Sequence, residues 1–442
     1  MESHTHAAHG VTMDRSAETT GEMPVVLPAG RPVVTEAAGG PRTATARRSR
    51  WVAPAVGAAV AGLTVARLLS AGPGLDRVWA EDGFVFLWDA RRHGLASLVY
   101  SYAGYAHTLP RALGWVGAQL PLAYFAAYAV LSTAVIAGVL AAVVHTVARR
   151  VIGSSCWALL PALGVGLTPA FRGSVGSLAN LQWLLLLAAL WCLLDPVLPG
   201  RRRWLPCLVA LVAAATTPLT ALLLPVALLT HRRFVLRSPA VLGLLGGLAF
   251  QAAVITVGAH SADNPASRHV GFSASLSDAL LTAVAGPNTA PWQLGRFGTL
   301  DHSTLLGVVF AGALLLSLQA ARVRRTVAVA VAVTGLLLYA ATSVLSGAPT
   351  TRYSACAAMF LVSALALVGP ELPTLLRRVG LLALLVNIVL GFPASDFRLS
   401  GPSWHDEVAD YEQSCASTGR GTPLQLSPAG WGVVDLRCPT AG

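Results

Sequence analysis

The chain has 442 residues, of which 55% are hydrophobic and only 12% are charged. A soluble domain carries about 25% charged residues, so the composition excludes an ordinary soluble protein and indicates an integral membrane protein with many spans. The net charge of +11 does not indicate a nucleic-acid partner, because the arginines form short clusters between apolar segments, as cytoplasmic loops do under the positive-inside rule.

The N-terminal part of the chain predicts a tail followed by a first span. Residues 1–50 are polar and lack apolar periodicity, which indicates a disordered cytoplasmic tail. The apolar segment from Trp51 to about Ser70 is long enough to cross a bilayer. The arginines before it place the N-terminus in the cytoplasm. Residues 73 to about 120 then form a first external loop.

Eight further crossings are predicted from the remaining apolar segments, with arginine clusters on the cytoplasmic side of each turn. The segments are 122–146, 156–170, 181–194, 240–257, 305–320, 326–345, 354–368 and 381–392. A second external loop covers residues 258–303. An extracytoplasmic C-terminal tail covers residues 394–442.

The segment 204–230 does not fit this alternation. Arginines flank both of its ends, and its centre reads Thr216-Thr217-Pro218. The sequence predicts a broken hairpin of two short helices that enters and leaves on the cytoplasmic side, with irregular backbone buried in protein or lining a wet cavity. A single span with one misplaced arginine cluster is the alternative. The predicted fold is an all-α polytopic membrane domain over 51–393, with nine crossings plus the hairpin, or about eleven transmembrane helices.

The cysteines divide between the spans and the tail. Four of the six lie in predicted spans, where cysteine behaves as a small apolar residue. Cys415 and Cys438 lie in the tail that the topology places outside, where a disulfide is the expected state and two free thiols are the alternative. The sequence contains no metal-ligand spacing.

The first external loop concentrates acidic residues beside an apolar stripe. The stripe runs from Gly83 to Leu98 and predicts a helix along the outer membrane surface, with Asp89 on its wet face. Glu81 and Asp82 stand between the first span and this helix. Asp82 could simply cap the helix. The functional interpretation is a carboxylate that deprotonates or orients an acceptor hydroxyl.

An acidic residue directly after the first span and before a juxtamembrane helix resembles the GT-C superfamily of membrane glycosyltransferases. Three short motifs, at 79–83, 107–111 and 180–183, are similar to those of uncharacterised actinobacterial multi-span proteins of that type. They read Trp79-Ala80-Glu81-Asp82-Gly83, His107-Thr108-Leu109-Pro110-Arg111 and Asn180-Leu181-Gln182-Trp183.

The resemblance implies an inverting transfer of a sugar from a polyprenyl-phosphate donor to an extracytoplasmic acceptor, which would be a cell-wall glycan, a glycolipid or a protein. It implies a catalytic carboxylate at Asp82 or Glu81, and we favour Asp82 because it adjoins the interfacial helix. Members of the superfamily differ in whether a divalent metal assists.

Arginine suits the leaving phosphate, because its planar fork binds two oxygens at once. The candidates near the outer surface are Arg352, which opens a predicted span, Arg111, Arg67 and Arg172. Snorkelling to the interface is the alternative for each of the first three.

Four uncharged candidates complete the predicted site. Asn180 and Gln182 stand at an outer span entry and could bind sugar hydroxyls, or cap and pack. Trp79 could stack on a sugar ring or anchor the interface. His107 could lie beside the carboxylates or be an ordinary hydrogen-bonded loop residue.

The main alternative function is a transporter or flippase of lipid-linked envelope precursors. A transporter places ionisable residues near the bilayer midplane, whereas this sequence places them almost entirely in loops. No nucleotide-binding, zinc or nucleophile-elbow motif occurs. The sequence therefore favours a multi-pass plasma-membrane enzyme.

Overall fold

The computed structural model describes residues 42–195, 204–231, 236–257, 312, 314–319, 321, 324–346, 351–390 and 392–438. The chain divides into two units, Met1–Ala46 and Arg47–Gly442. The first unit is described only at the start of a helix, and the second contains everything that follows. The second loop predicted at 258–303, the tail before residue 42 and most of the span predicted at 305–320 lie outside the described residues.

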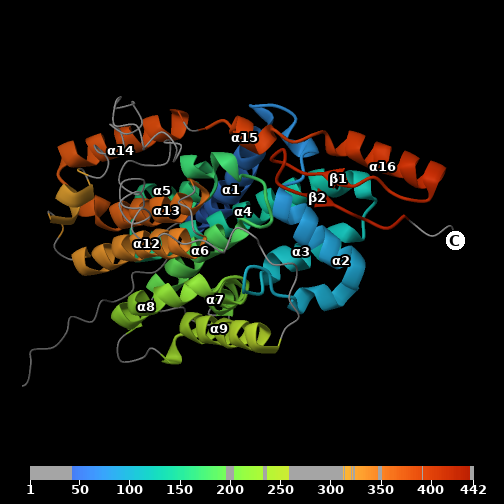
Figure 1. Cartoon of the computed structure of the whole chain (residues 1–442). Coiled ribbons are helices and arrows are strands. Elements are labelled where there is room, and N and C mark those ends of the chain that lie inside the picture. The colour runs from blue at the N-terminus through green and yellow to red at the C-terminus, as the bar shows by residue number, and fades with distance from the viewer. Residues whose placement is uncertain are drawn as a thin grey trace, which may run out of the picture. The chain divides into compact units, whose positions relative to one another are not determined.

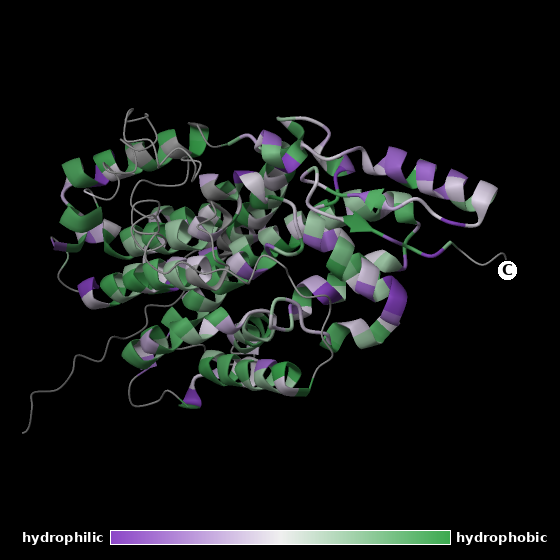
Figure 2. Cartoon of the chain, in the orientation of Figure 1, coloured by the Kyte–Doolittle hydropathy of each residue, from purple (hydrophilic) through white to green (hydrophobic). Residues whose placement is uncertain are grey.

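Five helices of the described chain are long and apolar enough to cross a membrane (Figures 1 and 2). They are α1 (Arg42–Leu69, apolar from Trp51), α4 (Phe125–Ile152), α9 (Pro239–Val257), α12 (Arg325–Ser346) and α13 (Thr351–Val368). Shorter apolar helical segments pack among them: α5 (Ser155–Leu167), α6 (Leu181–Leu194), α7 (Trp204–Thr216), η7 (Pro218–Leu223), α8 (Leu224–His231) and α14 (Thr374–Leu390). The all-α membrane class is therefore as predicted, although α1 begins at Arg42, inside the stretch predicted to be disordered.

The remaining elements are short and lie between or after these helices. They are η1 (Gly74–Asp76), η2 (Asp82–Leu87), α2 (Trp88–His93), η3 (Gly94–Val99), α3 (Thr108–Ala118), η4 (Leu122–Tyr124), η5 (Pro169–Gly173), η11 (Gly369–Glu371), α15 (Asp396–Leu399), α16 (Trp404–Thr418), β1 (Leu424–Gln425) and β2 (Val433–Val434). The predicted interfacial helix is thus three consecutive pieces, η2, α2 and η3. The two strands pair antiparallel, with Leu424 opposite Val434.

The chain reverses direction after α7. Close approaches pair Gly243 of α9 with Cys207 of α7, and Gly247 with Leu211. Residue numbers rise together along the two helices, so α7 and α9 run parallel. Two parallel helices need a returning segment between them, which η7 and α8 supply after the extended residue Thr217. This geometry agrees with a broken hairpin and contradicts one continuous span.

Helix ends gather at two opposite ends of the bundle. At one end, the Arg67 guanidinium of α1 donates to the Gly166 carbonyl of α5 at 2.8 Å and to the Phe392 carbonyl after α14 at 2.8 Å. At the other end, Arg150 of α4 donates to Asp195 after α6 through Nε at 2.9 Å. The first end also carries Glu81 and Asp82, and we call it the acidic end. For these five helices, the ends predicted to share a side lie at the same end of the bundle.

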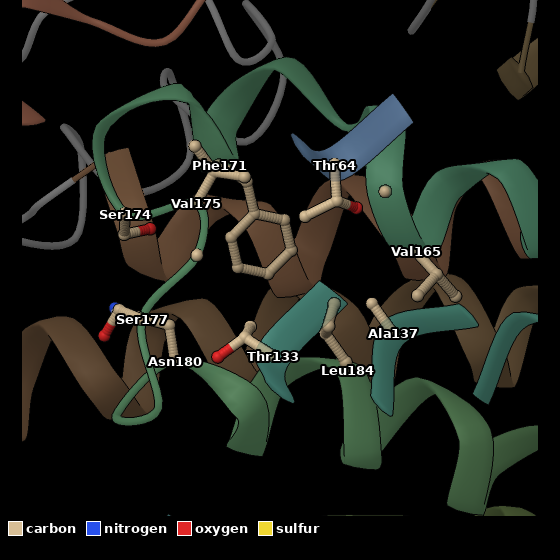
Figure 3. A pocket seen from close by; sticks show the side chains of 12 residues that line it. Thr64, Thr133, Ala137, Val165, Phe171, Ser174, Val175, Ser177, Asn180 and Leu184 are labelled. Atoms are coloured by element: carbon tan, nitrogen blue, oxygen red, sulfur yellow. The ribbon is translucent and has the colours of Figure 1, made fainter. Parts of the chain in front are cut away.

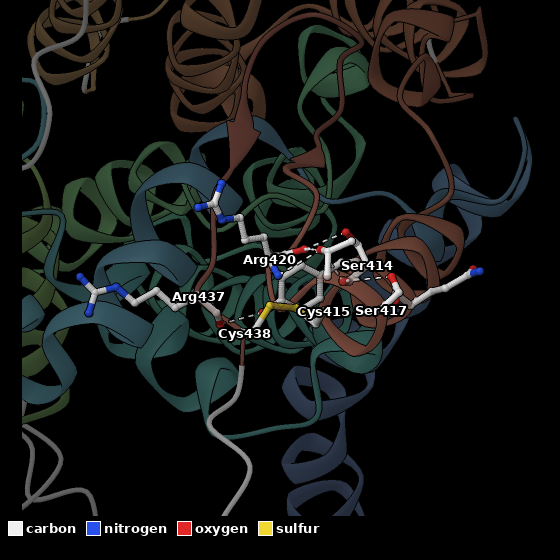
Figure 4. Close-up of a disulfide and its surroundings, with 9 residues drawn as sticks. Ser414, Cys415, Ser417, Arg420, Arg437 and Cys438 are labelled. Carbon is white, nitrogen blue, oxygen red and sulfur yellow. Dashed lines mark hydrogen bonds between the residues drawn. A yellow bond between two sulfur atoms is a disulfide. The ribbon is translucent and has the colours of Figure 1, made fainter.

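The C-terminal segment is a folded cap. Residues 394–438, the C-terminal cap, contain α15, α16 and the β1–β2 hairpin. Cys415 and Cys438, the pair expected from the sequence, are joined by a disulfide (Figure 4). The Trp404 indole at the start of α16 donates to the Leu122 carbonyl at 2.8 Å, which ties the cap to the beginning of α4. The segment predicted as a polar tail is therefore part of the acidic end.

Candidate active site

The Asp82 carboxylate is buried and held by three neutral donors. Its side chain is 1% exposed. Oδ2 accepts from the Leu178 amide at 2.9 Å, and Oδ1 accepts from the Ala179 amide at 3.0 Å and from Ser177 Oγ at 3.2 Å. These donors belong to the turn that leads into α6. Asp82 therefore joins the first loop to the start of α6, and its predicted role as a helix cap is wrong, because η2 has no side-chain cap.

Burial sets the protonation of this carboxylate. Removal from water raises the pKa of Asp82 to about 7, and Glu81 adds to the rise; the Ala179 and Leu178 amides and the Arg398 charge oppose it. A general base works best when its pKa lies near the operating pH. Asp82 is thus able to exist in both protonation states near neutral pH.

Arg398 of α15 is the residue that sequence reasoning missed. Its side chain is fully buried. Nε donates to the Val175 carbonyl at 3.1 Å, and the guanidinium lies 5.5 Å from the centre of the Trp79 ring. Burial lowers the pKa of Arg398 to about 10, and the Asp82 charge opposes that shift. The available signal was an arginine just outside the last span, in a segment that its polarity marked as a tail.

The C-terminal cap closes directly over the acidic loop. Ala80 donates its amide to the Ser427 carbonyl at 2.7 Å, and the Ser427 amide donates to the Val78 carbonyl at 2.8 Å. A Cβ at Gly83 would collide with the Leu426 side chain. Trp79, proposed from sequence to stack on a sugar, is instead buried under the cap. Its ring packs against Phe397 and Trp431 at centroid distances of 6.3 and 5.9 Å.

A second polar cluster lies between α2 and α3. The Arg111 guanidinium of α3 forms an ion pair with Asp89 of α2 at 2.8 Å, and each side chain is 1% exposed. Arg111 also donates to the carbonyls of Ser97 and Ala106. The prediction that Asp89 lies on a wet face is wrong, because α3 packs over α2 and covers it. Arg111 neither snorkels nor presents its charge at the surface.

His107 belongs to this second cluster. Its backbone is left-handed, with φ 52° and ψ 41°, and its ring stacks on Tyr105 at 3.9 Å. Burial and then the Arg111 charge lower the pKa of His107 to about 3, against a smaller opposing effect of the Tyr102 backbone. The imidazole is therefore neutral at physiological pH. Tyr105 donates its hydroxyl to Gln182 Oε1 at 3.0 Å, so Gln182 supports this loop.

The other predicted residues have structural partners or lie outside the described side chains. Asn180 donates Nδ2 to Ser177 Oγ at 3.1 Å and accepts from the Trp183 indole at 3.1 Å, so it braces the turn that holds Asp82. Arg67 is fully buried on backbone carbonyls, so it does not snorkel. Arg352 lies in the first turn of α13, and its side chain is outside the described residues.

The structure thus brings seven of the nine predicted site residues together in two groups at the acidic end. Glu81, Asp82, Trp79 and Asn180 lie with Arg398, while His107, Arg111 and Gln182 lie with Asp89. Within the described ranges, no three His, Cys, Asp or Glu side chains are grouped so as to hold a metal ion. The first group offers proton transfer by a carboxylate beside a guanidinium. No protein-family model, curated protein or solved structure matches the chain.

Proposed function

We propose that the chain is a membrane glycosyltransferase of the GT-C type, which transfers a sugar from a polyprenyl-phosphate donor to an extracytoplasmic glycan, glycolipid or protein. The observation that carries the proposal is Asp82, a desolvated carboxylate with a pKa of about 7 at one end of an apolar bundle. The acidic end then faces the outside of the plasma membrane, as the arginine distribution predicts.

In the proposed reaction, Asp82 or Glu81 accepts the proton of the acceptor hydroxyl. The acceptor oxygen attacks the anomeric carbon from the side opposite the phosphate, the bond from that carbon to the phosphate oxygen breaks, and polyprenyl phosphate leaves. Configuration at the anomeric carbon inverts. No step is assigned to a metal ion.

The proposed chemistry needs a path for the acceptor to the buried carboxylate. The segment around Leu426 and Ser427 packs on Gly83 and Ala80, the neighbours of the buried Asp82, and in this proposal it lifts to admit the acceptor. Arg398 and Ser427 belong to the same cap, because Ser427 Oγ donates to the Arg398 carbonyl at 2.6 Å. Movement of the cap would therefore also shift Arg398, the guanidinium neighbour of Asp82.

The alternative, a transporter or flippase, draws support from the break after α7, because discontinuous helices form transport sites. Against it, charges inside the described spans are few. Arg67 lies in the last turn of α1, and its guanidinium is bonded to backbone carbonyls. A transport site needs ionisable groups near the midplane, so the enzyme is the better proposal.

The test compares Asp82→Asn and Glu81→Gln with the wild type in lipid nanodiscs, using polyprenyl-phosphate mannose and polyprenyl-phosphate arabinose as donors. The matched control is Asp76→Asn, the same change at a partly exposed carboxylate of the same loop. We expect transfer to fall about 10²–10⁴-fold for the variant that removes the base, and to persist in the control. Full transfer by both folded variants would overturn the proposal.

The transport alternative is separated by a second measurement on the same proteins. Vesicles that contain the chain are loaded with polyprenyl-phosphate mannose on both leaflets, and the fraction open to an external reagent is followed over time. An enzyme of the proposed kind leaves that fraction unchanged. Movement between leaflets that continues without an acceptor would favour the flippase.

A further inference from the structure

A small cavity lies beside Ser177, between α1, α4 and the segment that leads into α6 (Figure 3). Its volume is about 20 Å³. One water molecule requires roughly 10–15 Å³ of such space, so the cavity admits a single water. The polar side chains that line it are Thr64, Thr133, Ser174, Ser177 and Asn180.

The hydroxyls around the cavity leave places for a water. Thr64 and Thr133 donate their protons to the carbonyls of Val60 and Ala129, each at 2.8 Å, so their lone pairs stay open to a donor. Ser174 Oγ is buried and has no hydrogen-bond partner among the described residues. A buried hydroxyl without a partner is costly, and a water with two to four polar neighbours would satisfy it.

Ser177 connects this cavity to Asp82. Its hydroxyl donates to Asp82 Oδ1 and accepts from Asn180 Nδ2. Of the three donors to Asp82, only this hydroxyl can also accept, because a backbone amide has no free lone pair for the purpose. When Asp82 is protonated, Oδ1 can donate to Ser177 Oγ. The proton of Ser177 must then turn to another acceptor.

We propose that the cavity binds one water molecule, which accepts the Ser177 hydroxyl proton whenever Asp82 is protonated. Ser174, Thr133 and the water are then positioning groups for Asp82. The water would accept from Ser177 and Ser174 and donate to the threonine oxygens. No bond to carbon changes, and no group is oxidised or reduced. The proposal does not depend on what reaction Asp82 serves.

The charges around Asp82 are consistent with two hydrogen-bond patterns. Ser177 donates to Asp82 when Asp82 is ionised, and Asp82 donates to Ser177 when Asp82 is protonated. Arg398 of α15 faces it and favours the ionised form, whereas burial and Glu81 of its own loop favour the neutral form. From the turn before α6, the Ser177 hydroxyl and the amides of Leu178 and Ala179 donate to Asp82. With the pKa of Asp82 raised to about 7, both patterns occur near neutral pH.

Infrared difference spectroscopy of the full chain in nanodiscs tests this. Acid-minus-base spectra should contain a carboxylic C=O band that Asp82→Asn abolishes, together with an O–H band that shifts in H₂¹⁸O. Ala137→Leu fills the cavity. It should remove the water band and lower the titration midpoint of the C=O band by roughly one pH unit, as expected for one lost hydrogen bond to the neutral form.

Thr133→Val keeps the shape of the cavity wall and should shift the water band if the Ala137 variant fails to fold. Thr146→Val is its matched control, because Thr146 makes the same bond to the carbonyl four residues earlier but is exposed. Absence of an ¹⁸O-sensitive band that follows the titration of Asp82 would overturn the proposal. So would an unchanged band in both cavity variants.

Discussion

Asp82 and Asp89 belong to the same loop and are equally buried, yet the structure stabilises them differently. Asp82 is held by two amides and a hydroxyl, whereas Asp89 pairs with the Arg111 guanidinium at 2.8 Å. Neutral donors leave the cost of burial largely uncompensated, so the pKa of Asp82 rises to about 7. A full opposite charge offsets that cost directly. The loop thus contains one carboxylate suited to proton transfer and one suited to holding α2 against α3.

Breaking the charged pair should have the largest effect on stability. Arg111→Met leaves Asp89 buried without its counter-charge, which typically costs 3–5 kcal/mol. The measurement is the thermal unfolding midpoint in nanodiscs. Arg150→Met is the control, because the Arg150 side chain is 37% exposed, although that of its partner Asp195 is 5% exposed, so we expect a smaller loss than for the fully buried pair. Equal, small losses from both variants would show that Asp89 does not need its guanidinium.

Opening the disulfide should act on the Asp82 region alone. Cys415 and Cys438 are separated by 23 residues, and a loop of that size is worth about 3 kcal/mol by the chain-entropy estimate. The double serine variant should speed hydrogen exchange at Ala80 and Ser427, which the cap protects, and leave Arg111 unchanged. Cys156→Ser, at an exposed free thiol, is the control. Faster exchange at both places would mean that the two regions unfold together.

The pH dependence of stability should show opposite slopes from the two regions. The folded-state pKa of Asp82 is raised to about 7, so only the folded state holds that proton between about pH 4 and 7, and stability falls as pH rises through this window. The folded-state pKa of His107 is lowered to about 3. Only the unfolded state then holds the imidazole proton from about pH 3 to 6.5, and stability rises with pH there.

Each slope amounts to at most about 1.4 kcal/mol per pH unit, so the two largely cancel in the wild type. Asp82→Asn should leave a curve that rises with pH between 4 and 6.5, and His107→Gln one that falls. Denaturation midpoints across this range provide the measurement. If stability changed with pH in the same direction in both variants, the opposite pKa shifts assigned to Asp82 and His107 would be wrong.

The sequence located these regions better than it described their bonding. Arginine clusters predicted which helix ends share a side, and Thr217-Pro218 predicted the break after α7, because charge and backbone restriction are local properties. Asp89 was placed on a wet face because its helix was considered alone. Its burial depends on α3, which packs over it through Arg111. The apolar periodicity of one helix does not show which of its residues another helix will bury.

Arg398 illustrates a second limit. Its neighbour Asp82 lies more than 300 positions earlier in the chain, and polarity marks the segment around Arg398 as a tail. Only packing of the cap, through Ser427 and Leu426, brings the two charges together. Conversely, the resemblance leaves Asp82 and Glu81 open, and position beside the predicted interfacial helix favours Asp82, whereas in the structure three hydrogen bonds from the turn before α6 hold Asp82.

The smallest expected effect tests whether the two regions are independent. Tyr105→Phe removes the hydroxyl that donates to Gln182 at 3.0 Å and keeps the ring that stacks on His107, so it should cost about 1 kcal/mol. Tyr128→Phe, which removes a similar bond to the Leu113 carbonyl, is the matched control. The titration midpoint of the Asp82 C=O band should stay unchanged in both variants. Gln182 and Asn180 begin the same helix, so a shifted midpoint in Tyr105→Phe alone would mean that α6 couples the two carboxylates.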